Sequence, residues 1–397
     1  MRVALFTDTY WPQVNGVART LERLVDHIAV RGGRVALISP RIGRRRARAP
    51  EIHIRLPGVR VPFYPELRMA RPLVRRELAA LEHFAPDIVH LATEFTVGWS
   101  GLRWAARHHV PVVSSFHTDF PAYLHGYGLG LLARPLWAYL RAFHAGSSVT
   151  LCPTTVTRGQ LLERGFHDRL RIWPRGVDSE RFHPRLRSDE FRERVAPGGG
   201  TILIYVGRLA PEKRLELLLD AFARARRRSR SRLQLVLVGD GPQARTLRQR
   251  RIDGVRFTGY LRGEALSEAY ASADLFVFPS DTETFGNAVL EAMASGVAPI
   301  VVDRGGVVEL VEDGRTGRVV PAGDAEALAT AIVELAADGD RRRRLAVAAR
   351  PAALERDWER ILDDVLDEYR RVAGRRGALA RPRSKEVPVS ARALGGI

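Results

Sequence analysis

Cysteine, lysine and long hydrophobic runs are what this sequence lacks. Its 397 residues include one cysteine, Cys152, which excludes an intrachain disulfide framework and is expected to be a small buried apolar residue. No apolar run approaches the roughly 18–20 residues that span a bilayer. The first apolar stretch ends at Asp8 and is too short for the hydrophobic region of a signal peptide. These absences predict a cytoplasmic protein.

The positive charge comes almost entirely from arginine. The formal charge is +18, yet Lys213 and Lys385 are the only lysines. Because arginine is used throughout, the basicity reflects composition and is weak evidence for nucleic-acid binding. The sequence shows no recognition helix and no basic surface interleaved with aromatic residues, so we expect no nucleic-acid partner. The same composition singles out Lys213, where a compact ammonium group is kept within the folded body.

Strand and helix patterns alternate in two separate halves of the chain. The length favours two domains, and such alternation is typical of parallel sheets covered on both faces. A helix is also expected over residues 66–84, bent or restarted at Pro72. The predicted units are a doubly wound domain at 1–178, a linker at 179–200, a second doubly wound domain at 201–350, a last helix at 351–372 and a disordered basic tail at 373–397.

Residues 278–296 carry most of the functional information. The segment reads as a buried strand, a loop and a short apolar helix, in which Gly286 permits close approach to the backbone. Glu291 is the polar exception on that helix and needs a partner, which is either an internal arginine or a ligand. Glu283 lies at the helix start, where free N–H groups favour anions. Two carboxylates here suit a ligand with hydroxyls and phosphates.

Other polar residues follow predicted strands, where parallel sheets bind ligands. Arg208 and Lys213 follow one strand, and their spacing allows both cations to reach one diphosphate, although two solvated cations are the alternative. His117 directly follows another strand and is either a structural histidine or a site residue. Asn15-Gly16 forms either a phosphate-binding loop or a plain turn. Loops of two domains that face each other predict an interdomain cleft.

Two motifs suggest other functions. Gly239-Asp240-Gly241 follows a strand and loosely matches a dinucleotide fingerprint, which leaves an NAD(P)-dependent oxidoreductase as an alternative of a different class. Asp338-Gly339-Asp340 has the form of a metal-binding D-x-D motif, but it precedes a run of arginines and is interpreted as a surface turn. No His, Cys and carboxylate cluster has metal-ligand spacing, so we expect no metal and no other cofactor.

Taken together, the motifs resemble those of the retaining glycosyltransferases of family 4, which have the GT-B fold. The resemblance covers about residues 1–337. Residues 116–120, 127–128 and 175–178 look closest to bacterial GDP-mannose-dependent α-mannosyltransferases and sulfoquinovosyl-lipid synthases. The motifs that carry the resemblance are Glu283-x7-Glu291, Gly207-Arg208-x4-Lys213, Val238-Gly239-Asp240-Gly241-Pro242, Glu291-Ala292-Met293-Ala294-Ser295-Gly296 and Asn15-Gly16-Val17.

The resemblance implies a role for each site residue. Arg208 and Lys213 would bind the donor diphosphate and stabilise the leaving group, Glu291 would bind the ribose, and Glu283 the sugar hydroxyls. Gly16 would approach the phosphate from the first domain, and His117 would contact the sugar near the reacting carbon. Many relatives carry Asn in place of Arg175, for which no role is implied. The implied catalytic residues are His117, Glu283, Arg208 and Lys213, and the implied donor-binding residues are Gly16, Gly207, Arg208, Lys213, Gly241, Glu283, Phe285, Gly286 and Glu291.

The implied function is metal-independent, retaining transfer of a hexose by attack on the same face as the departing nucleotide. The expected donor is GDP-mannose, and the expected acceptor is a lipid or glycan in envelope glycoconjugate synthesis. A UDP-sugar-dependent glycolipid synthase, transferring glucose or sulfoquinovose, is the alternative. The last helix would cross back onto the first domain. Arginines at 68–76 suggest peripheral contact with an anionic membrane at its inner face, or else a solvated helix surface.

Overall fold

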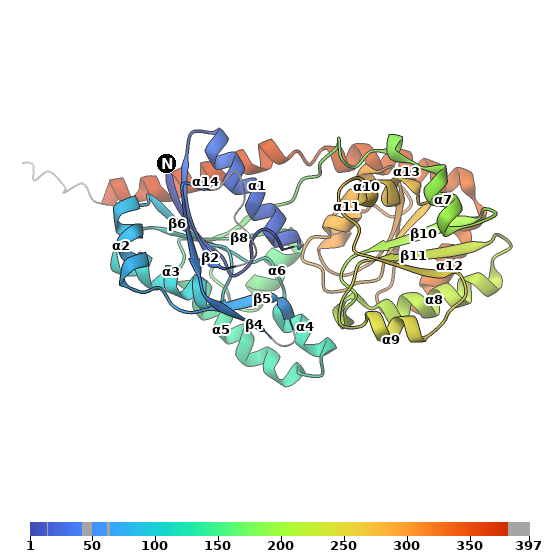
Figure 1. The fold of residues 1–397 in the computed structure, drawn as a ribbon, viewed down its shortest axis with the longest axis horizontal. Helices are drawn as coiled ribbons and strands as arrows, with labels where there is room; N and C mark the ends of the chain where they lie inside the picture. Colours follow the sequence, from blue (N-terminus) through green and yellow to red (C-terminus); the bar gives the residue numbers. More distant parts are fainter. Residues whose placement is uncertain (14, 42–49, 62–63, 380–397) are drawn as a thin grey trace, which may run out of the picture.

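The computed structural model describes residues 1–13, 15–41, 50–61 and 64–379, which form two α/β domains side by side (Figure 1). Neighbouring strands are parallel in both large sheets, and each strand order reverses beside its first strand, which defines a doubly wound fold. The predicted fold class is therefore confirmed. In spatial order, the first sheet is β3 (Ile52–Leu56), β2 (Arg34–Pro40), β1 (Arg2–Phe6), β6 (Ile88–Leu91), β7 (Val112–Ser115), β8 (Val149–Cys152) and β9 (Leu170–Ile172). The second is β12 (Val255–Gly259), β11 (Leu233–Val238), β10 (Thr201–Val206), β13 (Leu275–Phe278), β14 (Ala298–Val302) and β15 (Arg318–Val320).

Helices cover both faces of the first sheet because its central strands are apolar on both sides. Along β1, Val3 and Leu5 pack into one core, and Ala4 and Phe6 pack into the other. Helices α1 and α14 cover the first of these faces, and α2 and α3 cover the second. The helices of this domain are α1 (Gly16–Val30), α2 (Arg75–Phe84), α3 (Thr96–Arg107), α4 (Phe120–Gly126), the 3-10 helix η1 (Gly130–Leu132), α5 (Ala133–Ala145) and α6 (Thr155–Glu163), and α14 (Trp358–Leu379) returns to it.

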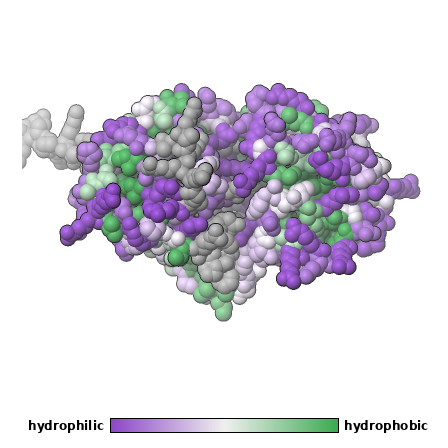
Figure 2. Space-filling model, in the orientation of Figure 1, coloured by the Kyte–Doolittle hydropathy of each residue, from purple (hydrophilic) through white to green (hydrophobic). Residues whose placement is uncertain are grey.

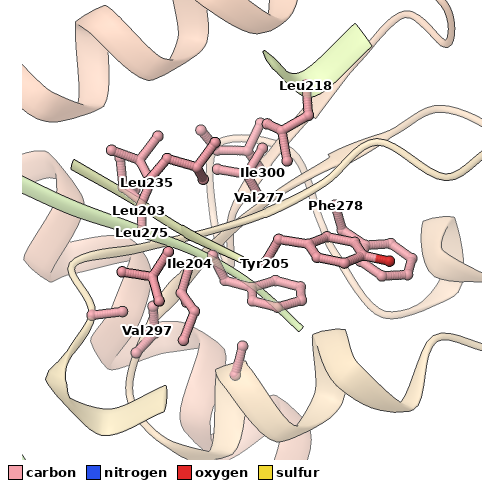
Figure 3. Packing of buried hydrophobic residues seen from close by; sticks show 14 of the residues in the cluster. Leu203, Ile204, Tyr205, Leu218, Leu235, Leu275, Val277, Phe278, Val297 and Ile300 are labelled. Carbon is pink, nitrogen blue, oxygen red and sulfur yellow. The ribbon is translucent and has the colours of Figure 1, made fainter. Parts of the chain in front are cut away.

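The second sheet has the same kind of core. Leu203, Tyr205, Leu275 and Val277 come from adjacent strands and pack among leucines and valines of the covering helices (Figure 3). Short 3-10 helices occur at η2 (Pro184–Leu186), η3 (Pro211–Lys213) and η4 (Gly306–Glu309). The α-helices are α7 (Asp189–Val195), α8 (Leu215–Arg228), α9 (Ala244–Gln249), α10 (Glu264–Ser272), α11 (Asn287–Ala294), α12 (Ala325–Ala337) and α13 (Gly339–Leu354). None of the described helices is both long and apolar enough to cross a bilayer.

The helix predicted over residues 66–84 is wrong in its first part. Residues 64–70 form strand β5 (Tyr64–Ala70), which pairs antiparallel with β4 (Gly58–Val61). Helix α2 begins only at Arg75, because Pro72 lacks an N–H and disfavours helical geometry in the residue before it. The arginines of 68–76 therefore do not share one helix face, and Arg71 instead pairs with Glu77 at 2.6 Å.

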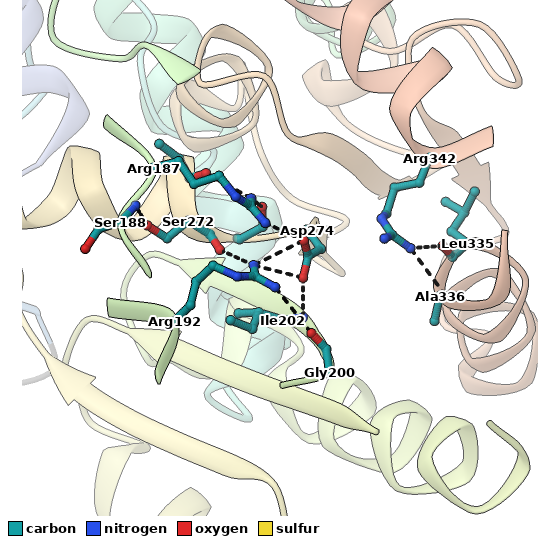
Figure 4. Close-up of polar contacts among 12 residues, drawn as sticks. Arg187, Ser188, Arg192, Gly200, Ile202, Ser272, Asp274, Leu335, Ala336 and Arg342 are labelled. Atoms are coloured by element: carbon teal, nitrogen blue, oxygen red, sulfur yellow. Dashed lines mark hydrogen bonds and ion pairs between the residues drawn. The ribbon is translucent and has the colours of Figure 1, made fainter. Parts of the chain in front are cut away.

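The segment predicted as a linker, residues 179–200, is largely built into the second domain. Phe182 and Phe191 are buried in the core of that domain. Arg187 and Arg192 approach the Asp274 carboxylate at 3.2 and 3.1 Å (Figure 4). Asp274 also accepts a hydrogen bond from the Ile202 N–H at 2.8 Å, so it joins the segment to the first residues of the sheet. Two arginines of the predicted linker are therefore anchored by this carboxylate.

Asp274→Ala is expected to lower the free energy of unfolding by about 3 kcal/mol, because it leaves the partly buried Arg192 guanidinium and the Ile202 N–H without their carboxylate. The Asp274 side chain is only 10% exposed, so water replaces it poorly. Asp253→Ala removes an exposed aspartate of the same domain and is the matched control. Chemical denaturation of both variants measures the difference, and equal stabilities would show that the Asp274 cluster is not an anchor.

The C-terminal helix crosses between the domains, but its bounds differ from the prediction. The structure has two helices, with a break at residues 355–357. Helix α13 packs on the second domain, whereas Ile361, Val365 and Tyr369 of α14 are buried in the first (Figure 1). Helix α14 continues to Leu379, so residues 373–379 are helical and not a disordered tail. Residues 380–397 lie outside the described residues, as does the basic stretch 42–49.

Candidate active site

A cavity of about 300 Å³ lies between the two domains, at the carboxyl ends of their central strands. The first domain contributes loops that follow β1, β6 and β7, and the second contributes loops that follow β10, β11 and β13. Gly241 does not line the cavity, because its α-carbon lies against Leu209, whose carbonyl oxygen would be 2.4 Å from an added Cβ. The other predicted site residues all line it, namely Gly16, His117, Gly207, Arg208, Lys213, Glu283, Phe285, Gly286 and Glu291.

The loop between β13 and α11 is held in one shape by glycine. Gly286 has a φ of +103°, in the left-handed region, and a Cβ there would lie 2.6 Å from the Val307 side chain. Thr284 links this loop to the first domain, because its hydroxyl donates to the His117 carbonyl at 2.7 Å. The Thr154 hydroxyl donates in turn to the Thr284 carbonyl at 3.1 Å. The loop that carries Glu283 is therefore fixed from both domains.

Lys213 and Glu283 form an ion pair inside the cavity. Lys213 lies at the end of the 3-10 turn that follows β10, and the Ser280 hydroxyl supports this turn by donating to the Glu212 carbonyl at 3.1 Å. Burial lowers the pKa of Lys213, but the Glu283 carboxylate, together with Tyr205 and Glu212, outweighs burial and raises that pKa. The ring of Tyr123, from the first domain, lies 5.7 Å from the ammonium. Lys213 therefore carries a charge in a largely enclosed site.

Arg208 places a second cation beside Lys213. It directly follows Gly207 after β10, and its side chain is 13% exposed. Its guanidinium lies 3.6 Å from the Glu212 carboxylate, which is longer than a direct hydrogen bond. Two cations thus line the same cavity, and each lies near a carboxylate. An anionic ligand in this cavity would gain from both positive charges.

Glu291 makes the internal ion pair that the sequence left open. One carboxylate oxygen accepts from Arg19 at 3.2 Å, and the other accepts from the Tyr270 hydroxyl at 2.9 Å. Arg19 belongs to α1, so this contact crosses from one domain to the other. Burial raises the pKa of Glu291, while Arg19 opposes that rise. A carboxylate has about four acceptor positions, so Glu291 can still accept hydrogen bonds from a ligand.

Arg175 sets the protonation of His117. Its guanidinium donates to the imidazole Nδ1 at 2.7 Å, which leaves the ring proton on Nε2. The same guanidinium donates to the Trp173 carbonyl at 2.6 Å and lies 4.7 Å from the centre of the Trp173 ring. Burial, and then the charge of Arg175, lower the pKa of His117 well below 6.5. His117 is therefore a neutral imidazole with one N–H donor left for a ligand.

Arg175→Ala is expected to raise the pKa of His117 toward 6.5, because it removes both the nearby charge and the bond to Nδ1. A histidine with a lowered pKa stays neutral until the pH falls through that pKa. The wild-type ring should therefore remain neutral at pH 6, and the variant ring should protonate at a higher pH than the wild-type ring does. An NMR titration of labelled histidine measures both, with His117→Gln to assign the signal.

The matched control is Arg171→Ala, which removes an exposed arginine four residues earlier. It should leave the His117 titration unchanged. A His117 signal that titrates near pH 6.5 in the wild-type protein would contradict the assigned proton position.

The cavity wall also includes residues that were not among the predicted site residues, among them Arg19, Tyr123 and Glu94. Arg19 gave no signal because arginine is abundant throughout the chain. Tyr123 lies on α4, a helix that the sequence patterns did not indicate. Glu94 could have been found, because it follows β6 and strand ends are where parallel sheets place ligands. Glu94 is buried, and its carboxylate lies 3.5 Å from the His144 imidazole.

Within residues 1–13, 15–41, 50–61 and 64–379, no group of three or more His, Cys, Asp or Glu side chains could hold a metal ion. Metal independence stays a prediction, which an activity measurement in a chelator would test.

Comparisons with known families match both halves of the chain. Residues 14–181 match the model described as glycosyltransferase family 4, and residues 200–338 match the model described as glycosyl transferases group 1. The two matched ranges together include every residue that lines the cavity except Thr9.

Individual relatives align along nearly the whole chain. A GDP-mannose-dependent alpha-mannosyltransferase of Mycobacterium tuberculosis is 38% identical over 382 residues, covering 95% of this chain and 98% of the relative. A sulfoquinovosyl transferase of Arabidopsis thaliana is 32% identical over 382 residues, covering 92% of this chain and 73% of the relative.

Solved structures share the arrangement of the two domains at much lower identity. A sucrose-phosphate synthase of Thermosynechococcus elongatus superposes with a TM-score of 0.76 at 22% identity, covering 94% of this chain and 100% of the synthase chain. Anabaena HepE in complex with UDP-glucose superposes with a TM-score of 0.71 at 18% identity, covering 93% and 98% of the two chains. These likenesses establish the fold alone.

Proposed function

The chain is a hexosyltransferase of glycosyltransferase family 4 with the GT-B fold, and from that premise we propose that it transfers mannose from GDP-mannose to a lipid or glycan acceptor. The observation that carries the proposal is the arrangement of charges in the cavity. Arg208 and Lys213 line the same cavity as the carboxylates of Glu283 and Glu291, and Lys213 pairs with Glu283. A nucleotide sugar has a diphosphate between two groups that bear hydroxyls, and this combination of cations and carboxylates complements it.

Arg208 and Lys213 would bind the diphosphate and stabilise the charge that develops on it. When the bond between the sugar carbon and the phosphate oxygen breaks, its electron pair goes to the diphosphate. The acceptor hydroxyl forms the new bond on the same face of the sugar and passes its proton to the departing phosphate oxygen. Cations that are already oriented stabilise such a transition state without rearrangement. Retention of configuration follows from attack on that face.

The carboxylates and His117 would orient the donor. Glu291 would accept hydrogen bonds from the ribose hydroxyls, and Glu283 from the sugar hydroxyls once phosphate competes for Lys213. The Nε2–H of His117 would donate to a sugar oxygen near the reacting carbon. Gly16, which lines the cavity, would approach the phosphate from the first domain. No metal is needed in this scheme.

GDP-mannose is the preferred donor, and a UDP-sugar is the alternative. The M. tuberculosis relative named for GDP-mannose is 38% identical, whereas the A. thaliana relative named for sulfoquinovosyl transfer is 32% identical. The acceptor would enter from the first domain, where Tyr123 and Glu94 line the cavity. We place this reaction at the inner face of a membrane, with the protein bound peripherally.

Transfer of labelled mannose tests the proposal. The purified protein is incubated with GDP-mannose and a lipid extract in the presence of EDTA, and labelled lipid and released GDP are measured together. Both should appear in equal amounts and be lost in Glu283→Ala. Label incorporated only from UDP-glucose or UDP-sulfoquinovose would establish the alternative donor. No release from any of these donors, with Glu283→Ala indistinguishable from wild type, would contradict the proposal.

A further inference from the structure

Three exposed leucines occupy the tip of the first domain beside the cleft. Leu129, Leu131 and Leu132 are 37%, 96% and 52% exposed, and Leu131 is the most exposed large hydrophobic residue in the described part of the chain. They lie in η1 and the turn before it, between α4 and α5, a region that projects below the sheet in Figure 1. Figure 2 shows hydrophobic atoms at this lowest point of the molecule.

The apolar surface continues from this tip along the outer side of α5. Leu131, Pro135, Ala138 and Ala142 are all exposed, and their spacing of three and four residues places them on one stripe. Leu140 and Phe143 of the same helix are buried, so the exposed stripe is not needed for packing within the domain. We call these exposed residues of 129–142 the leucine tip.

The sequence around the leucine tip carries charges of one sign. Residues 120–162 contain no Asp or Glu, although the chain has 45 acidic residues. Arg134 and Arg141 are exposed and lie along the same edge of the apolar stripe. An apolar stripe flanked by arginines complements a surface that is anionic outside and apolar inside. Two copies of this chain would bring like charges together if they paired through this face, which disfavours self-association.

The leucine tip lies at the rim of the active-site cavity. Helix α4 links the two, because Phe120 and Tyr123 near its start line the cavity and its last residue, Gly126, leads to the tip. Gly126 lies against the second domain, where Pro211 Cβ would be 3.2 Å from an added Cβ. A surface that contacts the tip would therefore be close to the entrance used by an acceptor.

We propose that the leucine tip inserts into the interface of an anionic lipid bilayer and directs the cleft toward an acceptor held in that bilayer. The choice of a lipid-borne acceptor rests on the proposed function, but the predicted membrane binding requires neither donor nor acceptor. The arginines 68–76, which the sequence suggested for this contact, are replaced in this role by Arg134 and Arg141.

Co-sedimentation of the full chain with vesicles tests the proposal. Vesicles of phosphatidylglycerol and phosphatidylcholine should bind the wild-type protein, more weakly as salt rises, and vesicles of phosphatidylcholine alone should bind it poorly. The double variant Leu131→Asp, Leu132→Asp should lower the partition coefficient on the anionic vesicles at least tenfold. Val347→Asp is the matched control, because Val347 is 74% exposed on α13 of the second domain, and it should bind as the wild type does.

The melting temperatures of all variants should equal that of the wild type, because the substituted side chains are exposed. Equal values exclude unfolding as the cause of weaker binding. The proposal would be overturned if the wild-type protein did not bind anionic vesicles, or if the double variant bound them as strongly as the wild type does. A loss of dimers in the double variant, with vesicle binding unchanged, would assign the tip to self-association and would also overturn it.

The result can be separated from a failure of the proposed function. If GDP-mannose is not a substrate but vesicle binding depends on the leucines, the result supports the leucine tip as a membrane-binding surface and contradicts the proposed donor. If transfer to a water-soluble acceptor is intact while vesicle binding is absent, the result supports the proposed transferase activity and contradicts the membrane-binding role of the leucine tip.

Discussion

Lys213→Gln is expected to lower kcat/KM for GDP-mannose by about 10²–10³-fold, which is the typical effect of removing one preoriented group that stabilises transition-state charge. The ammonium is largely enclosed and held in place by Glu283, so water cannot take over its role. Because the charge on the diphosphate grows as the bond to the sugar breaks, kcat should fall more than the donor KM rises. Initial rates of GDP release over a range of donor concentrations separate the two constants.

The matched control for this variant is Lys385→Gln, which removes the other lysine of the chain. It should leave both constants unchanged. A Lys213→Gln enzyme whose kcat/KM stays within about threefold of the wild-type value would contradict the role of this residue in leaving-group stabilisation. The thermal unfolding of the variant shows whether the fold is destabilised when Glu283 loses its ion-pair partner.

Glu291→Ala is expected to weaken GDP binding by about 100-fold, because two hydrogen bonds from the ribose hydroxyls to a charged acceptor would be lost. The wild-type protein should lose a similar factor when GDP is replaced by its 2′,3′-dideoxy analogue. The variant should bind GDP and the analogue equally, because its ribose hydroxyls no longer have this partner. Calorimetric titration of both ligands into both proteins completes the cycle.

Arg19→Gln is the control for this cycle. It breaks the contact of Glu291 with the first domain but keeps the carboxylate, so discrimination between GDP and the dideoxy analogue should persist. If Glu291→Ala still prefers GDP to the analogue by the wild-type factor, Glu291 is a structural residue that holds the domains together and not the ribose ligand.

The architecture was predictable because buried parallel strands leave continuous apolar runs in the sequence. The strand Thr201–Val206 and the strand that ends at Phe278 are recognised in this way, and the rule that ligands bind beyond strand ends then placed Arg208 and Glu283 at one cleft. The β4–β5 hairpin was not predictable, since its residues alternate poorly and Pro72 was interpreted as a bend within a helix.

The site was predictable only where a residue type is rare or a motif is long. Lys213 stood out because the chain has few lysines, whereas Arg19 and Arg175 could not stand out among so many arginines. Their roles depend on contacts across 272 and 58 residues of sequence, which no local pattern encodes. Gly241 was wrong as a cavity residue because a short glycine motif does not distinguish packing against a backbone from contact with a ligand.

The melting temperature in the presence of nucleotides tests the central claim, that this cleft binds the diphosphate of a GDP-sugar. In EDTA and at about a hundred times its Kd, GDP should raise the melting temperature by about 3 °C, because a ligand that binds only the folded state stabilises it. UDP at the same concentration should raise it less, and Lys213→Gln should abolish most of the shift. A larger shift with UDP than with GDP, or a GDP shift unchanged in Lys213→Gln, would contradict the account.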